Sequence, residues 1–437
     1  MRNRDAHNQG IRMHGLNSAK LYALEHAGVG GFSFLVFFTA THLANIEAVG
    51  TLAALWALVS VQSAVCSLGL DRLTYAQAGR EAAKRSSEAS SPTETLSHAI
   101  RASLLPRVGL AASVGLGIYV TTLIALAILS GAHATNLYAL LGMRLALGVI
   151  EPLRTYHQAV DAPARYALAR IVSLGVASLA LLITRGASGS LTGVAFIAGL
   201  EALAFALWMT GKSRAFGVRG DEWQDLSGLL KTSLPFLVQS LAIMIYLRID
   251  MLYVAQQFGP SDTALYASAA RIAEIGNGLA LVAMLTVTPP LIHQLRKSGQ
   301  HVGWSGLLIG MLGCAAFAAV CWIAGPHLLS LLFGRGYEAA SLILAIYALS
   351  VPFVFLGGVS SRLHASFDNQ KLPARITVLG ACLNVTLTAI LCAYVGPIGA
   401  ALATVISYAF VAFSLWFAFL RGLATTLDDQ VSEQSPM

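Results

Sequence analysis

The chain has 437 residues, of which 56% are hydrophobic and only 11% charged, and its mean hydropathy is +0.68. Soluble domains carry about 25% charged residues, so this composition excludes a soluble globular protein and predicts an integral membrane protein. The formal net charge of +7 does not indicate a nucleic-acid partner, because the basic residues lie in clusters between apolar segments.

Twelve apolar segments are each long enough to cross a bilayer, which requires about 20 residues. In chain order, the sequence predicts spanning helices over 22–42, 48–70, 107–130, 134–157, 166–185, 190–210, 228–255, 263–292, 303–324, 338–361, 373–395 and 397–420. We therefore expect an all-α integral membrane protein with about 12 transmembrane helices.

Lys and Arg side chains cluster before the first helix and after every even-numbered helix. The remaining connections hold only Arg185 and Arg335. Cytoplasmic loops carry an excess of positive charge, so this distribution predicts a multi-pass protein with both termini in the cytoplasm. An even number of helices agrees with this prediction, because it puts both termini on the same side of the membrane.

A polar break at 211–225 divides the helices into two sets of six. The segment "ARIVSLG" (169–175) in the first set resembles "ARITVLG" (374–380) in the second. We predict two pseudo-symmetric six-helix bundles, 1–215 and 216–437, around a central cavity, as in transporters built from parallel repeats. The polar end of the chain, 428–437, is predicted to be a short disordered tail.

Charged residues within the apolar segments of the first half are candidates for a site. Arg144 is near the middle of the fourth segment, and Glu151 falls near the same helical face. Arg154 follows Glu151 by three residues. Glu25 lies just inside the first helix, where we expect it to reach cytoplasmic water.

The second half places charges in two consecutive helices. Arg248 and Asp250 are two positions apart, so they point about 200° away from each other on a helix. Arg271, Glu274 and Asn277 follow one another at intervals of three and share a face. Arg248 and Arg271 are predicted at matching depths on antiparallel neighbours, with Asp250 and Glu274 available to balance them.

Two interpretations of these arginines are open. They either form internal salt bridges that fix the helices, or they line a path for a substrate, as intramembrane ionisable residues usually do. The planar guanidinium group can donate two parallel hydrogen bonds to the oxygens of one phosphate. Several arginines therefore favour an anionic or phosphorylated substrate over a cationic drug.

Residues 240–274 ("SLAIMIYLRIDMLYVAQQFGPSDTALYASAARIAE") and 331–408 resemble bacterial polysaccharide flippases of the multidrug/oligosaccharidyl-lipid/polysaccharide exporter superfamily. The segment 148–171 is similar to the connection between the fourth and fifth helices of that family. The first half is less similar, because "ATHLANIEAVG" (40–50) lacks the Arg that family members commonly have there.

The resemblance implies a flippase that moves undecaprenyl-pyrophosphate-linked oligosaccharide repeat units, for O-antigen or exopolysaccharide, across the bacterial inner membrane by alternating access. The implied partners are this lipid-linked oligosaccharide, the membrane lipids and the polysaccharide polymerase machinery. The expected substrate-binding residues are Arg248, Arg271, Arg144 and Asn277. The expected charge-balancing or ion-coupling residues are Asp250, Glu274, Glu151 and Glu25.

Three alternatives are open. A cation- or proton-coupled drug or metabolite antiporter of the same superfamily is expected to have acidic rather than basic deep residues. A flippase for the peptidoglycan lipid precursor is closer to the main prediction. A membrane enzyme needs a substantial outer loop, but the outer connections around 256–262 and 325–337 are short, and the sequence has no nucleophile–base motif or metal-ligand spacing. We therefore expect neither an enzyme nor a cofactor.

Overall fold

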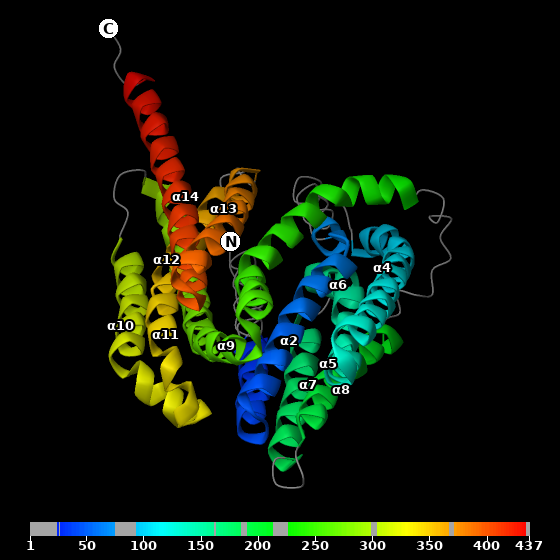
Figure 1. The fold of residues 1–437 in the computed structure, drawn as a ribbon. Coiled ribbons are helices and arrows are strands. Elements are labelled where there is room, and N and C mark those ends of the chain that lie inside the picture. The colour runs from blue at the N-terminus through cyan, green and yellow to red at the C-terminus, as the bar shows by residue number, and fades with distance from the viewer. Residues whose placement is uncertain are drawn as a thin grey trace. The chain divides into compact units, whose positions relative to one another are not determined.

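The computed structural model describes residues 24–25, 27–74, 93–160, 163–184, 190–212, 226–298, 304–366 and 371–433, and every regular element in these ranges is a helix (Figure 1). Ten of the described helical stretches are long and apolar enough to cross a membrane, and a shorter apolar helix runs from Ala27 to Leu43. One of the ten stretches holds two helices joined at Gly259. Counting both of these and the helix Ala27–Leu43 gives twelve apolar helices within the described residues. The predicted all-α class is confirmed, and the chain is a multi-pass membrane protein.

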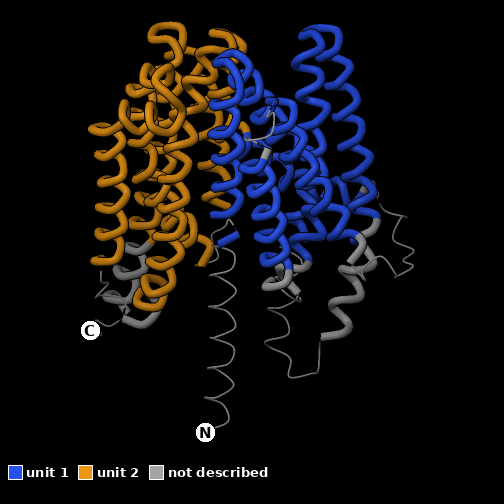
Figure 2. Tube along the Cα trace, turned by 90° about the horizontal axis from the view of Figure 1, so that it is seen from below, with its two compact units in different colours: residues 1–244 blue, residues 245–437 orange. Residues whose placement is uncertain are grey.

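The chain divides into two compact units, 1–244 and 245–437, which Figure 2 colours separately. The boundary falls inside α9, whereas the sequence predicts a division at 215. The related fold of the two halves and a cavity between them stay predictions.

Unit 1 includes the helix Ala27–Leu43. Among its other helices, α6 packs against α2, α4 and α8, and α8 also packs against α5 and α7. Its elements are α2 (Ile46–Cys66), α4 (Thr93–Leu129), α5 (Gly131–Leu141), the 3₁₀ turn η1 (Gly142–Arg144), α6 (Leu145–Val160), α7 (Pro163–Thr184), α8 (Leu191–Lys212) and the first part of α9 (Leu226–Ser298).

Unit 2 contains the rest of α9 and the C-terminal helices, with α14 packed along α12 and α13. Its further elements are α10 (Ser305–Phe333), the 3₁₀ turn η4 (Arg335–Ala340), α11 (Ser341–Ala348), α12 (Ser350–Ser366), α13 (Lys371–Val395) and α14 (Pro397–Glu433). α14 continues as a helix into the predicted disordered tail, because no Gly or Pro follows Gly422 until Pro436.

The turn inside α9 needs only one non-helical residue. Gly259 has φ +84°, a left-handed conformation that glycine adopts without a steric cost. Pro260 follows at the first position of the next helix, where its missing N–H is not needed. The two halves of α9 are therefore joined as a tight helical hairpin.

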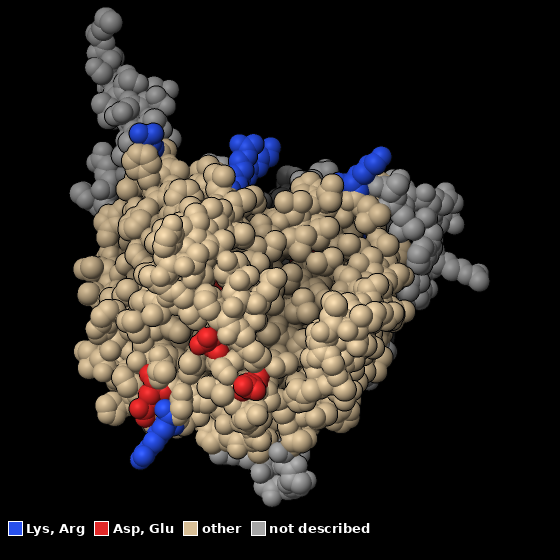
Figure 3. Space-filling view, viewed as in Figure 1, with Lys and Arg blue, Asp and Glu red and all other residues tan. Residues whose placement is uncertain are grey.

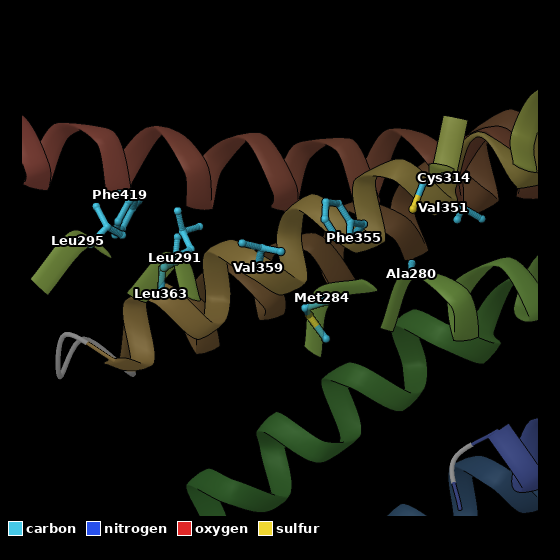
Figure 4. Close-up of a cluster of buried hydrophobic side chains, with 10 residues drawn as sticks. All are labelled: Ala280, Met284, Leu291, Leu295, Cys314, Val351, Phe355, Val359, Leu363 and Phe419. Atoms are coloured by element: carbon cyan, nitrogen blue, oxygen red, sulfur yellow. The ribbon is translucent and has the colours of Figure 1, made fainter. Parts of the chain in front are cut away.

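Each unit has its own apolar core. In unit 2, side chains from α9, α10, α12 and α14 form the cluster drawn in Figure 4, which is centred on Phe355 and Val359. In unit 1, α4, α6, α7 and α8 enclose a cluster around Leu153 and Phe205. Large apolar side chains such as Ile323, which is 79% exposed, lie outside these cores, and most of the face in Figure 3 carries no charge. Such a surface suits lipid rather than water.

Candidate functional site

Two arginines of α9 converge on one carboxylate. Arg248 Nη1 donates to Glu274 Oε1 at 2.6 Å, and Arg271 Nη1 donates to Glu274 Oε2 at 2.7 Å. We call these three residues the α9 triad. The Arg271 side chain is 4% exposed, Arg248 19% and Glu274 31%, so the carboxylate is the most accessible member.

The hairpin in α9 explains why these residues meet. Arg248 precedes Gly259 by 11 residues and Arg271 follows it by 12, so both lie at the same level on antiparallel halves. A single charge at the bilayer centre costs roughly 2.5–3.5 kcal/mol on insertion scales, so the shared carboxylate offsets part of the cost of two arginines. The triad itself has a net charge of +1.

The hydrogen bonds described for Asp250 come from hydroxyl and backbone donors rather than from the arginines that it is predicted to balance. It is 2% exposed, and its Oδ1 accepts from the Met251 N–H at 2.7 Å. Its Oδ2 accepts from the hydroxyls of Tyr266 at 2.6 Å, Thr404 at 3.3 Å and Tyr347 at 3.5 Å. Asp250 points away from Arg248 because the two are two positions apart on one helix. Sequence reasoning missed these hydroxyl donors.

Asn277 lies one helical turn beyond Glu274, as its spacing predicts. Its Oδ1 atom is buried and has no hydrogen-bond partner within the part of the chain that the structure describes. A buried amide oxygen without a donor is costly, so this atom is available to accept a hydrogen bond from a ligand or water.

In unit 1, Arg154 lies between two carboxylates. Its Nη1 donates to Glu151 Oε1 at 2.9 Å and its Nη2 to Glu25 Oε1 at 3.1 Å. Its guanidinium also lies 5.4 Å from the centre of the Tyr166 ring. Glu25 is only 2% exposed, so the expectation that it reaches cytoplasmic water is wrong. The ion pair with Arg154 makes its burial possible.

Arg144 belongs to a different cluster from Glu151. Its Nη1 donates to the Ala198 carbonyl at 3.1 Å and lies 3.9 Å from Glu201 Oε2, and its guanidinium stacks 4.3 Å from the Trp56 ring centre. Arg144 ends the 3₁₀ turn η1, whose tighter winding rotates it away from the face of α6 that carries Glu151.

Glu201 is the centre of this second cluster of unit 1. Its Oε1 accepts from Arg170 Nη1 and, at 2.9 Å, from Ser173 Oγ. Arg170 is one of the basic residues that follow the fourth predicted helix, which the sequence places on the cytoplasmic side, and Glu201 was missed as its partner. A lone acidic residue within the apolar run "GLEALAF" was the available signal.

The arginine-rich clusters can bind anions, and arginine is chemically suited to phosphate. Within the described ranges, no group of three or more His, Cys, Asp or Glu side chains is placed to hold a metal ion.

Solved transporter structures resemble the fold over nearly its whole length. The lipid II flippase MurJ in its inward closed conformation gives a TM-score of 0.67 at 14% identity and covers 92% of this chain and 86% of that one. An inward-facing multidrug resistance MATE family transporter of the MOP superfamily gives 0.66 at 15% identity, covering 93% and 96%. A MOP superfamily transporter from Pyrococcus furiosus gives 0.62 at 14% identity, covering 94% and 95%.

At these identities the likeness establishes the fold, which is the superfamily fold that the sequence resemblance implies. No curated protein matches the chain closely enough to count as a relative. Residues 162–432 match the family described as lipid II flippase MurJ. This match covers more than half of the sequence and includes the whole α9 triad, and the chain therefore belongs to the MurJ family of lipid II flippases.

Proposed function

We propose that the protein moves the peptidoglycan lipid precursor, a glycan carried on undecaprenyl pyrophosphate, from the cytoplasmic to the outer leaflet by alternating access. The family match over 162–432 supports this substrate over the O-antigen or exopolysaccharide unit that the sequence resemblance implied. The convergence of Arg248 and Arg271 on one carboxylate is the single observation that carries the proposal. Two guanidinium groups held this close together support the binding of one pyrophosphate by both.

The proposed roles of the other residues follow from their contacts. Asn277 supplies an acceptor beside the triad for a glycan hydroxyl. Arg144 binds anionic groups of the substrate in unit 1, while Glu151 and Glu25 balance Arg154. Asp250 is the candidate for ion coupling, because it is a buried carboxylate with no arginine hydrogen-bonded to it among the described contacts.

We further propose that the protein lies in the bacterial inner membrane with both termini in the cytoplasm. The distribution of Lys and Arg supports this orientation. A precursor delivered to the outer leaflet must be consumed there by an enzyme that polymerises the glycan, which is the class of partner expected.

Flipping in proteoliposomes tests the proposal. Fluorescent lipid II is incorporated in both leaflets, and its accessibility to a membrane-impermeant quencher is followed with wild-type protein and with Arg271→Gln. We expect transport by the wild type and at least a tenfold loss in the variant, since about 1.4 kcal/mol of lost binding corresponds to that factor.

Two comparisons decide between the alternatives. Transport of a lipid-linked O-antigen unit but not of lipid II would identify a polysaccharide flippase instead. Movement of a cationic dye under an ion gradient, without movement of either glycolipid, would identify an antiporter. Equal transport of lipid II by wild type and Arg271→Gln would leave the function in place and assign the α9 triad to structure alone.

A further inference from the structure

We propose that Glu274 is an internal counter-anion, which the pyrophosphate of the substrate must displace from Arg248 and Arg271. The inference rests on the proposed function and deepens it, because it identifies the residue that sets how tightly the site holds an anion. A purely structural carboxylate would instead stay bound to both arginines throughout transport.

The geometry of the triad allows the exchange. The arginines contact different oxygens of the same carboxylate, at 2.6 Å and 2.7 Å. Two oxygens of a phosphate group have a similar spacing and share its negative charge, so they accept the same hydrogen bonds from guanidinium groups. A phosphate can therefore replace the carboxylate, and each arginine can donate to it through the same Nη1 atom.

The burial of the three side chains determines which of them can move. Arg271 is 4% exposed and fixed by its surroundings, whereas Glu274 is 31% exposed. Gly278 lies one turn beyond Glu274 on the same face of α9, and a β-carbon built there would meet no atom within 4 Å. The space beside Glu274 is open, so the carboxylate can swing away without disturbing the packing of the helices.

The neighbouring charges single out Glu274 rather than Asp250 as the displaced group. Asp250, Tyr347 of α11 and Tyr408 of α14 all interact electrostatically with members of the triad. Asp250 has hydroxyl and backbone donors of its own, which an anion on the arginines leaves untouched. Glu274 has the two arginines as its hydrogen-bond partners in the triad, so an incoming anion competes with it directly.

Binding of inorganic pyrophosphate to the purified full-length protein in detergent tests this competition by isothermal titration calorimetry. Glu274→Gln removes the competing charge, and we expect the variant to bind at least about tenfold more tightly than wild type. Arg271→Gln should lose the binding. Glu338→Gln is the matched control, because Glu338 is exposed on η4 and its substitution changes the net charge equally; its affinity should equal that of wild type.

The opposite results would overturn the inference. Glu274→Gln that binds pyrophosphate no more tightly than wild type shows that the carboxylate does not compete. Equal tightening in Glu338→Gln shows that only the overall charge matters.

Wild-type protein provides a second test if Glu274→Gln does not fold. A carbodiimide modifies carboxyl groups that are not held in ion pairs, and peptide mapping by mass spectrometry identifies the modified residue. We expect pyrophosphate to increase modification of Glu274. Unchanged or reduced modification of Glu274 contradicts displacement.

Lipid II flipping, measured on the same preparations, separates this inference from the proposed function. Wild type that flips lipid II, together with Glu274→Gln that binds pyrophosphate no more tightly, refutes the inference and keeps the function. Tighter binding in Glu274→Gln, together with wild type that does not flip lipid II, keeps the anion site and refutes the substrate.

Discussion

Replacing Gly199 with alanine should destabilise unit 1 by forcing two helices apart. Gly199 lies on α8, and a β-carbon there would overlap the backbone carbonyl of Leu140 on α5, far inside the 3.4 Å at which ordinary contact begins. A backbone atom cannot rotate away as a side chain can. Overpacking of this kind typically costs 1–3 kcal/mol, so we expect about 2 kcal/mol. The shift also moves Ala198, whose carbonyl accepts from Arg144.

Thermal unfolding in detergent, followed by tryptophan fluorescence, measures the effect. Unit 1 spans 244 residues, and for a domain of that size about 2 kcal/mol lowers the Tm by about 4–8 °C. Gly175→Ala on α7 is the matched control, since a β-carbon there meets nothing within 4 Å. Its Tm should stay the same or rise slightly, because alanine favours the helix by up to about 1 kcal/mol. Equal Tm values for the two variants would refute the close contact between α5 and α8.

Two further substitutions test buried polar contacts by the same measurement. Tyr266→Phe removes the hydroxyl that donates to Asp250 at 2.6 Å, and it should lower the stability by about 1–3 kcal/mol. Tyr394→Phe, at a tyrosine that is 82% exposed, is the control and should leave the Tm unchanged. A lower Tm in both variants would contradict a specific contact between Tyr266 and Asp250. Arg154→Gln leaves Glu25 buried without its counter-ion and should cost about 3–5 kcal/mol. Adding Glu25→Gln to that variant should restore part of the Tm, and no recovery would show that Glu25 does not depend on Arg154.

The spanning helices were predictable because lipid imposes a simple rule on the sequence. Each span must be apolar for about 20 residues, and the segments predicted at 166–185 and 190–210 match spans at Tyr166–Ile183 and Leu191–Thr210. The proximity of Arg248 and Arg271 was also predictable, because a short turn fixes which residues of two neighbouring helices lie at the same level.

Contacts between distant helices were not predictable in the same way. The donors to Asp250 include Tyr347 and Thr404, which lie 97 and 154 residues away in the sequence. Nothing in the local pattern indicates which helices will pack together. Glu201 was missed for a related reason, because its main partner Arg170 lies 31 residues away, on another helix, α7.

The glycan of the substrate was hard to predict for a chemical reason. Arginine side chains are chemically suited to pyrophosphate, which polysaccharide and peptidoglycan precursors share. The sugars that distinguish these lipids extend beyond the charged group. Clustered arginines therefore favour an anionic group without identifying the glycan attached to it.

The single-residue turn at Gly259 has a consequence for biosynthesis. All three members of the α9 triad belong to one hairpin, so the arginines meet their carboxylate as soon as its two halves are side by side. Contacts that are local in sequence form early, before distant helices are available. The hairpin can thus enter the bilayer as a unit that brings its own counter-ion, and integration of these arginines need not wait for α10 to α14 to be synthesised.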